Sequence, residues 1–288
     1  MTARLGRADL HIHSLASDGT DGIAAILDHA EHRAGLDVIA ITDHERIDAA
    51  LAARTMAGEQ GLRVEVIVGE EVSTLGGHLL ALFIEERVRP LRTLRTTIAE
   101  IHEQGGLAIP AHPLVPYPLC AQGWVLRRLL ADPDPRVRPD AVEAFNPTMF
   151  GRPWHGKVVA FAARFGLATV GNSDAHEAAA VGAGWTTFPG RGAEDVRTAI
   201  LAHETHHHGS FHATGGQVAT FGRQLRKYTR DAGAVVRGTV RRDGSGRDLG
   251  YPGGRHRPPR FAEEWAAIRT GAGTAPTARG AESEDETR

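Results

Sequence analysis

The sequence predicts an α/β protein made of repeated strand–helix units, and three observations lead to this prediction. Short apolar runs of strand length alternate with longer stretches whose apolar residues recur at helical spacing. Several of the helical stretches stop at a glycine, which ends helices readily because it adopts the left-handed conformation. Histidine, aspartate and glutamate stand close to the apolar runs, at the ends of the predicted strands, and in barrels of parallel strands the carboxyl ends converge on one face.

Length and composition fit one main folded domain. The chain has 288 residues, of which 41% are hydrophobic and 24% charged, as in ordinary globular proteins. Barrels of this class often fill about 200–250 residues as a single unit, and we assign residues 1–216 to this domain. Residues 217–288 are predicted to form one amphipathic helix and a low-complexity, disordered tail, since they cannot supply a core of their own.

The alternation of elements is clearest in the first half of the chain. In the first helix Ile23, Ile26, Leu27 and Ala30 fall on one face, and Gly35 ends it. The predicted strands are, in chain order, 8–12, 38–42, 64–68, 78–83, 107–109, 141–145 and 168–170. The later predicted helices cover 47–60, 91–104, 124–130, 153–165 and 193–202. Together these elements make about seven βα units.

Two segments depart from this alternation. The prolines of 113–139 predict a long irregular connection around the helix at 124–130, which could serve as a lid or a substrate loop. A histidine-rich run over 203–212 has no ligand spacing on a fixed strand or helix face, and we interpret it as a surface loop.

Charge and cysteine content exclude several classes of protein. A formal charge of -2 provides no bulk field for nucleic acid. The single cysteine, Cys120, cannot form a disulfide within the chain, and it lacks the charged sequence neighbours that would mark a reactive thiolate, so we expect it to be a bystander. No signal peptide and no apolar run of about 18 residues is found. These features predict a reducing, cytoplasmic location without membrane contact.

The residues that follow the predicted strands are suited to binding metal. His11 and His13 are two positions apart, so on a strand both imidazoles point to the same face and can share one ion. The full set at the strand ends is His11, His13, Asp18, His44, Glu70 or Glu71, His78, His112, Asp174 and His176. Gathering so many imidazoles and carboxylates in one place without cations would be costly, and the spacing alone does not choose between Glu70 and Glu71.

The motifs around these residues resemble, in order, those of the polymerase and histidinol phosphatase (PHP) family of metallohydrolases. They are Asp9-Leu10-His11-Ile12-His13-Ser14, Ser17-Asp18-Gly19, Thr42-Asp43-His44, Gly69-Glu70-Glu71-Val72-Ser73, Gly77-His78, Ala111-His112-Pro113 and Gly171-Asn172-Ser173-Asp174-Ala175-His176. The resemblance spans about residues 8–211. It implies a distorted, seven-stranded (β/α)7 barrel, similar to a TIM barrel, that holds two or three divalent metals and cleaves phosphoester bonds.

The resemblance also implies a role for each position. It places the bridging carboxylate at Glu71, which leaves Glu70 pointing away or supporting a ligand, and Asp43 either orienting its turn or binding metal. The implied sets are His11, His13, Glu71 and Asp174 for the first metal, Glu71, His78 and His112 for the second, and Asp18, His44 and His176 for the third. The members of the first set, His11, His13, Glu71 and Asp174, are the predicted catalytic residues.

The ligand types indicate the chemistry. Mixed imidazole and carboxylate ligands suit Mn²⁺, Fe²⁺ or Zn²⁺ better than Mg²⁺. Neighbouring cations would lower the pKa of a bridging water and supply a hydroxide for in-line attack on phosphorus. No serine or cysteine nucleophile is then required.

One departure from the family concerns the substrate. Several nucleotide phosphatases that the chain resembles carry a long insertion between the GH and AHP motifs, which supplies basic substrate contacts. Here only a strand, a helix and a strand separate His78 from His112. Substitute contacts could come from Asn146, Arg152 and Lys157, although the two basic residues are equally suited to be a solvated helix start.

We therefore expect a metal-dependent hydrolase of phosphoric esters that acts on a small phosphorylated molecule, either a phosphomonoester or a nucleotide-like compound. The alternatives are an oligonucleotide exonuclease of the same family, with either polarity, a carbamate or ester hydrolase, and a metal-bound regulatory module without activity. The basic stretch 223–242 has few interleaved aromatic residues, so we interpret it as a solvated helix and nucleic acid as the less favoured partner.

Overall fold

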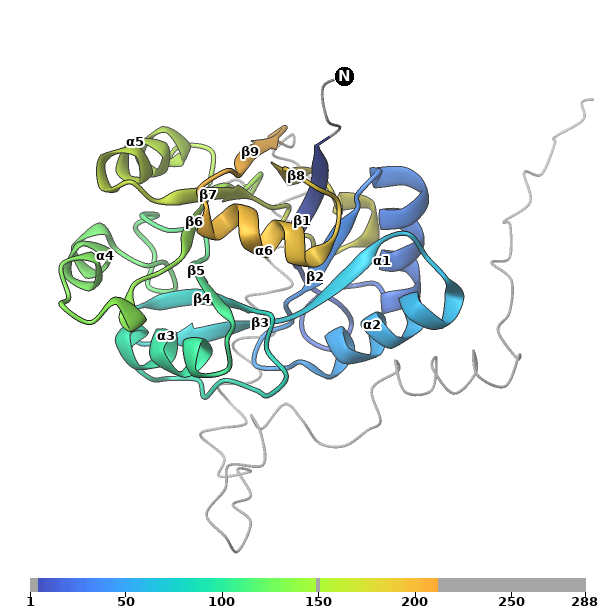
Figure 1. The fold of residues 1–288 in the computed structure, drawn as a ribbon, viewed down its shortest axis with the longest axis horizontal. Coiled ribbons are helices and arrows are strands. Elements are labelled where there is room, and N and C mark those ends of the chain that lie inside the picture. The colour runs from blue at the N-terminus through green and yellow to red at the C-terminus, as the bar shows by residue number, and fades with distance from the viewer. Residues whose placement is uncertain (1–4, 149–150, 212–288) are drawn as a thin grey trace, which may run out of the picture.

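A computed structural model describes residues 5–148 and 151–211. Its centre is a curled sheet with helices arranged around it (Figure 1). Three strands, β1 (Gly6–Ile12), β2 (Val38–Ile41) and β3 (Glu65–Thr74), pair in parallel. They are almost entirely buried, as expected for parallel strands that are covered on both faces.

The helices that connect these strands end where the glycines predict. The first, α1 (Ile23–His29), continues as a π-helical turn over Ala30–Ala34 and stops at Gly35, while α2 (Asp48–Gln60) stops at Gly61. Both glycines adopt φ 63°, a left-handed conformation that costs glycine little. The predicted helix stops are confirmed, and the apolar faces of both helices pack against β2 and β3.

The next two strands break the parallel pattern. The strand β4 (Gly77–Leu82) runs antiparallel to β3, because only two residues separate them and so short a connection can only reverse the chain. After α3 (Leu94–Glu103), β5 (Leu107–Pro110) pairs antiparallel with β4. Seven uniform βα units are therefore not what the structure shows; the sheet is mixed.

The second half of the chain adds a smaller sheet. Its two strands, β6 (Ala141–Phe145) and β7 (Ala168–Gly171), are parallel. The three remaining helices are α4 (Gly123–Leu130), α5 (His155–Phe165) and α6 (Ala193–Leu201). Inner faces of β1, β2, β6 and β7 share one apolar cluster with α6, so the two sheets enclose a common core.

Two strands were not predicted. The strand β8 (Gly184–Phe188) pairs antiparallel with β1, and β9 (His206–Gly209) pairs antiparallel with β8 at the edge of the seven-stranded sheet. The prediction of a surface loop for the histidine-rich run is thus wrong for β9. Its imidazoles suit a strand because they have partners: His207 Nδ1 lies 3.0 Å from Thr169 Oγ1, and the ring of His208 stacks on Trp185.

The segment that follows β7 joins the smaller sheet to β1. Ala175 forms a parallel bridge with Ile12, and the amide of Leu10 donates to Asn172 Oδ1 at 3.1 Å. These bonds place the last of the histidine- and aspartate-bearing motifs, residues 171–176, directly beside the first.

Within the described ranges, no helix is long and apolar enough to cross a bilayer. The helix and tail predicted for 217–288, and with them the boundary at 216, lie outside the residues that the structure describes.

Candidate metal centre

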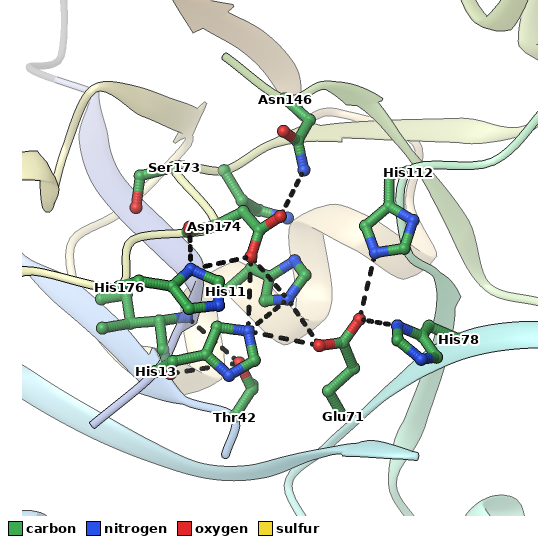
Figure 2. Close-up of polar contacts among 12 residues, drawn as sticks. His11, His13, Thr42, Glu71, His78, His112, Asn146, Ser173, Asp174 and His176 are labelled. Atoms are coloured by element: carbon green, nitrogen blue, oxygen red, sulfur yellow. Dashed lines mark hydrogen bonds and ion pairs between the residues drawn. The ribbon is translucent and has the colours of Figure 1, made fainter. Parts of the chain in front are cut away.

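The side chains singled out at the strand ends gather in one cluster, most of which Figure 2 shows. Its nine members are His11, His13, Asp18, His44, Glu71, His78, His112, Asp174 and His176. Most follow or end strands at the carboxyl ends of the parallel part of the sheet. His78 instead begins its strand, and it reaches the same place because antiparallel pairing sets it opposite Ser73 near the end of β3.

Glu71 lies at the middle of the cluster, and its two carboxylate oxygens face different imidazoles. Oε1 lies 2.8 Å from His78 Nδ1 and 3.2 Å from His112 Nε2. Oε2 lies 3.2 Å from the Nε2 atoms of both His11 and His13. Glu71 therefore stands between two sets of nitrogen donors, as a bridging carboxylate must.

The neighbouring carboxylates have other partners. Glu70 faces away from the cluster, where its Oε2 accepts a hydrogen bond from the amide of Val88 at 2.9 Å. Asp43 holds the turn after β1, because its oxygens accept hydrogen bonds from Ser14 and Ser17, including those of both hydroxyls. The sequence left two roles open for Asp43, orienting its turn or binding metal, and these contacts match the first.

Four groups of three side chains bring one donor atom each within 4.8 Å of the others. The groups are His11, His13 and Asp174; Glu71, His78 and His112; His13, Asp18 and His176; and His13, His44 and Glu71. The second has the members of the set that the resemblance implies for the second metal, and the first has three of the four implied for the first metal, without Glu71. The third implied set is divided, since His44 groups with His13 and Glu71, although its Nε2 also lies 3.8 Å from Asp18 Oδ2.

The donors fit divalent cations. His11 Nε2 and His13 Nε2 are 3.1 Å apart, so a proton or a cation must separate their lone pairs, and both face Asp174 Oδ1 at 3.4 and 3.3 Å. Imidazole nitrogen with carboxylate oxygen is a donor set typical of Zn²⁺, Mn²⁺ and Fe²⁺ sites. No thiolate belongs to the four groups among the described residues.

Mutual attraction dominates the electrostatics of the cluster. Burial lowers the pKa of His11, but the charges of Asp174 and Glu71 outweigh burial and hold this pKa well above its usual value. The pKa of His13 is raised to about 10 against burial, by the surrounding carboxylates. Burial raises the pKa of Glu71, whereas His78 and His11 hold it well below its usual value. Without metal, the rings of His11 and His13 are therefore protonated at neutral pH, and bound cations would replace these protons.

Two residues of the cluster have strained backbones. His112 has φ 32° and Asp174 has φ 50°, conformations that cost a side-chain-bearing residue about 1–3 kcal/mol. Each belongs to a different one of the first two groups. The surrounding hydrogen bonds must hold both turns in place.

Two residues that contact histidines of the cluster were missed or misjudged from the sequence. Glu143 is buried on β6, and its Oε1 lies 3.0 Å from His11 Nδ1. A lone carboxylate within the apolar strand 141–145 was the signal that could have identified it. Cys120, expected to be a bystander, lies with its Sγ 3.2 Å from His112 Nδ1. That expectation rested on sequence neighbours, whereas the contact is made across the loop.

The three residues predicted to contact substrate lie in different surroundings. Asn146 lies next to the cluster, where its Nδ2 donates to Asp174 Oδ2 at 3.2 Å (Figure 2). Arg152 is exposed, with its guanidinium 5.6 Å from the ring centre of Phe211. Lys157 is also exposed, and its Nζ lies 3.7 Å from the ring centre of Trp154.

A small pocket connects the cluster with the start of α5. It is lined by His112, Pro113, Val115, Glu143, Ala144, Asn146, Gly151, Trp154, His155 and Val158. Trp154 thus stands both in the wall of this pocket and beneath the ammonium group of Lys157.

Comparison with known proteins adds three findings. The family model PHP_C, described as PHP-associated, matches residues 152–205. The uncharacterised protein MJ1587 of Methanocaldococcus jannaschii is 34% identical over 151 residues, which make up 49% of this chain and 81% of that protein. The phosphoribosyl 1,2-cyclic phosphate 1,2-diphosphodiesterase of Eggerthella lenta is 38% identical over 92 residues, 30% of this chain and 34% of that enzyme.

A similar fold occurs in a solved structure. It is a two-domain protein from Bacteroides vulgatus that contains a predicted PHP-like metal-dependent phosphoesterase. The similarity has a TM-score of 0.58 at 18% sequence identity, and it covers 76% of this chain and 69% of that chain. At this identity the comparison shows a shared fold.

Proposed function

The chain belongs to the PHP family of metal-dependent phosphoesterases, and on this premise we propose that it hydrolyses a phosphoester bond in a small phosphorylated molecule. The observation that supports the proposal is the position of Glu71, whose two oxygens face imidazoles of separate donor groups. A carboxylate placed in this way can hold two cations next to each other, which is the arrangement used by metal-dependent phosphoesterases.

Each donor group has a part in this proposal. His11, His13 and Asp174 would hold one divalent ion together with Glu71, Glu71 with His78 and His112 would hold a second, and Asp18 and His176 with His13 or His44 a third. Bound ions of this kind lower the pKa of a water and neutralise charge on phosphoryl oxygens. Mn²⁺, Fe²⁺ and Zn²⁺ are the candidates that the donor types favour.

The chain's own side chains would prepare the reaction by holding these donors in place and by meeting the substrate. Asn146 donates a hydrogen bond to Asp174 and lines the pocket, and we propose that it meets the phosphoryl group of the substrate there. Arg152 and Lys157, in the turn before α5 and at its start, are proposed to meet the outer charge of the substrate. Both side chains are exposed and in contact with aromatic rings, so their charges are available to an incoming anion.

The Eggerthella lenta relative acts, by its name, on a cyclic phosphodiester. We therefore include phosphodiesters, linear and cyclic, beside phosphomonoesters among the substrates to be tried. The match covers only about a third of that enzyme, so its substrate is a guide to the assay and not an assignment.

The test combines metal analysis with a hydrolysis screen. Purified protein is analysed for bound metals and then assayed with Mn²⁺ against phosphomonoesters, cyclic and linear phosphodiesters, short RNA and carboxyl esters. We expect about two or three metals per chain and phosphate release from a small ester, and we expect Asp174→Ala to abolish it. Metal without phosphate release would overturn the phosphoesterase proposal, and turnover of carboxyl esters alone would point to acyl hydrolysis instead.

A further inference from the structure

A single buried carboxylate, that of Glu143, supports the metal-facing residues from behind. Glu143 is 1% exposed and lies on β6, whose other residues are apolar and buried. It belongs to none of the four donor groups among the described residues. A buried carboxylate is costly unless its oxygens are fully bonded, so its surroundings indicate what it does.

Both oxygens of Glu143 are fully occupied by N–H groups. Oε1 lies 3.0 Å from His11 Nδ1 and accepts from Asn172 Nδ2 at 2.8 Å. Oε2 accepts from the backbone amide of His112 at 2.7 Å and from Asn146 Nδ2 at 3.0 Å. Four donors fill the four lone-pair directions of an ionised carboxylate, whereas a protonated one would lose one of these acceptor positions.

The bond to His11 decides which imidazole nitrogen is available to a metal. Because Glu143 can only accept, His11 Nδ1 must carry the hydrogen, and in the neutral ring Nε2 then carries the lone pair. Nε2 is the atom that faces Glu71 Oε2 at 3.2 Å and Asp174 Oδ1 at 3.4 Å. A carboxylate behind a metal-binding histidine fixes both its tautomer and its ring orientation.

The second oxygen reaches the other donor group. Its bond to the amide of His112 holds that residue in its strained conformation, at φ 32°. Its bond to Asn146 fixes the amide that in turn donates to Asp174 Oδ2 at 3.2 Å. Glu143 thus contacts His11 directly, Asp174 through Asn146, and the backbone of His112.

We propose that Glu143 is a positioning residue that orients two neighbouring donor groups at once, the one formed by His11, His13 and Asp174 and the one formed by Glu71, His78 and His112. This inference rests on the proposed function, in that it takes both groups to hold metal. In this inference Glu143, which lies outside the donor groups, keeps the lone pair of His11 on Nε2, where a metal can bind it.

Glu143→Gln tests the inference with almost no change in shape. One oxygen of the carboxylate becomes an NH₂ group, which donates hydrogen bonds and cannot accept them. If this NH₂ group faces His11, the imidazole can accept its hydrogen bond at Nδ1 by carrying its own hydrogen on Nε2 instead. The metal-facing lone pair is then lost. We expect Glu143→Gln to bind metal about 10–100-fold more weakly than the wild type, in the range for loss of a residue that supports a ligand.

The matched control is Glu31→Gln. Glu31 is also buried, and its carboxylate also accepts several N–H groups, from Arg63 and Val64, but it lies outside the donor groups. Its loss is expected to lower the melting temperature while leaving metal affinity unchanged. Titration with Zn²⁺ against a competing chelator gives the affinity, and ¹⁵N NMR of the imidazoles in the zinc-loaded proteins reports which nitrogen of His11 carries the hydrogen.

The outcomes separate the two proposals. Wild-type metal affinity in Glu143→Gln, with the hydrogen of His11 still on Nδ1, would overturn the role of Glu143. A wild type that binds metal but cleaves no ester would overturn only the proposed function, whereas a wild type that binds no metal would overturn both. If Glu143→Gln does not fold, Asn146→Leu cuts the link to Asp174 alone. It is then expected to weaken metal binding about tenfold, and unchanged affinity would count against the inference.

Discussion

Cys120 places its Sγ 3.2 Å from Nδ1 of His112, so a buried thiol contacts the back of an imidazole whose Nε2 faces Glu71. The loop that carries the thiol is held firmly. The amide of Cys120 donates to the carbonyl of Tyr117, and Gln122 Nε2 donates to the carbonyl of Cys120. The preceding carbonyl, of Leu119, accepts from the amide of His78. One loop therefore contacts both histidines of the group formed by Glu71, His78 and His112.

Replacement of Cys120 by alanine should weaken this group specifically. Without a partner at Nδ1 the ring of His112 loses its fixed orientation, and we expect about tenfold weaker binding of one metal per chain. Cys120→Ser, which keeps an acceptor, should recover part of the loss. Metal content after stepwise chelation provides the measurement. Equal metal affinity in wild type, alanine and serine variants would show that the thiol contact has no influence on His112.

Metal binding should depend steeply on pH. The pKa of His13 is raised to about 10 by neighbouring carboxylates despite burial. Asp174 and Glu71 hold the pKa of His11 well above its usual value against burial, and Cys120 and Glu71 do the same for His112. A proton must leave each of these rings before a cation can bind, so apparent affinity rises as pH rises from about 6 to about 9. Proton release on addition of Zn²⁺ to a weakly buffered solution measures this linkage directly. Binding without proton release, and with equal affinity at both pH values, would contradict it.

Asp174 tests the assignment of the donor groups. Its carboxylate Oδ1 faces both His11 Nε2 and His13 Nε2, and its backbone is strained. Asp174→Ala should abolish metal-dependent hydrolysis and release at least one metal, while the far-ultraviolet circular dichroism spectrum stays unchanged. The control is Asp28→Ala, whose exposed carboxylate lies 3.9 Å from His32 Nε2 and belongs to none of the donor groups of the described residues. Full activity of Asp174→Ala with its metal retained would refute the assignment.

Residues that belong to a local pattern were predictable. His11 and His13 at strand spacing, and polar residues after apolar runs, led to all nine members of the cluster, since parallel strands bring their carboxyl ends together. The choice of Glu71 over Glu70 depended on the family resemblance, because adjacent positions on a strand face opposite sides and periodicity alone did not show which side was inward.

Features that depend on contacts across the fold were not predictable. Glu143 is one charge in an apolar strand, and only the assembled structure shows four donors around it. The strand β8 has an alternating burial pattern, but it is short and pairs with β1, far away in the sequence. The strand β9 was not predicted because its residues are mostly histidines, and their partners Thr169 and Trp185 belong to other strands. Composition had indicated a loop.

His102, which lies outside the cluster, should make the free energy of unfolding depend on pH. His102 on α3 lies with Nδ1 2.7 Å from the carbonyl of Arg136 and Nε2 2.9 Å from Asp140 Oδ2, so both ring nitrogens face acceptors. The hydrogen bond with Asp140, opposed by partial burial, raises the pKa of His102 above its usual value of 6.5. Because the pKa of His102 is higher in the folded state, its protonation stabilises that state, and this contribution is complete below about pH 6.5. It is lost as the pH rises through the folded-state pKa.

His102→Ala should therefore lower the free energy of unfolding at pH 6 by about 1.5 kcal/mol, the lower end for a hydrogen bond to a charged group because both side chains are partly exposed, and by less at pH 9. Urea unfolding at the two pH values measures the difference, with His32→Ala as the control because its side chain is 61% exposed. The difference between wild type and variant must shrink as pH rises, because the proton that strengthens the bond to Asp140 is then lost from the folded protein as well. A difference that stays constant or grows at pH 9 would show that His102 contributes through packing and not through its charge.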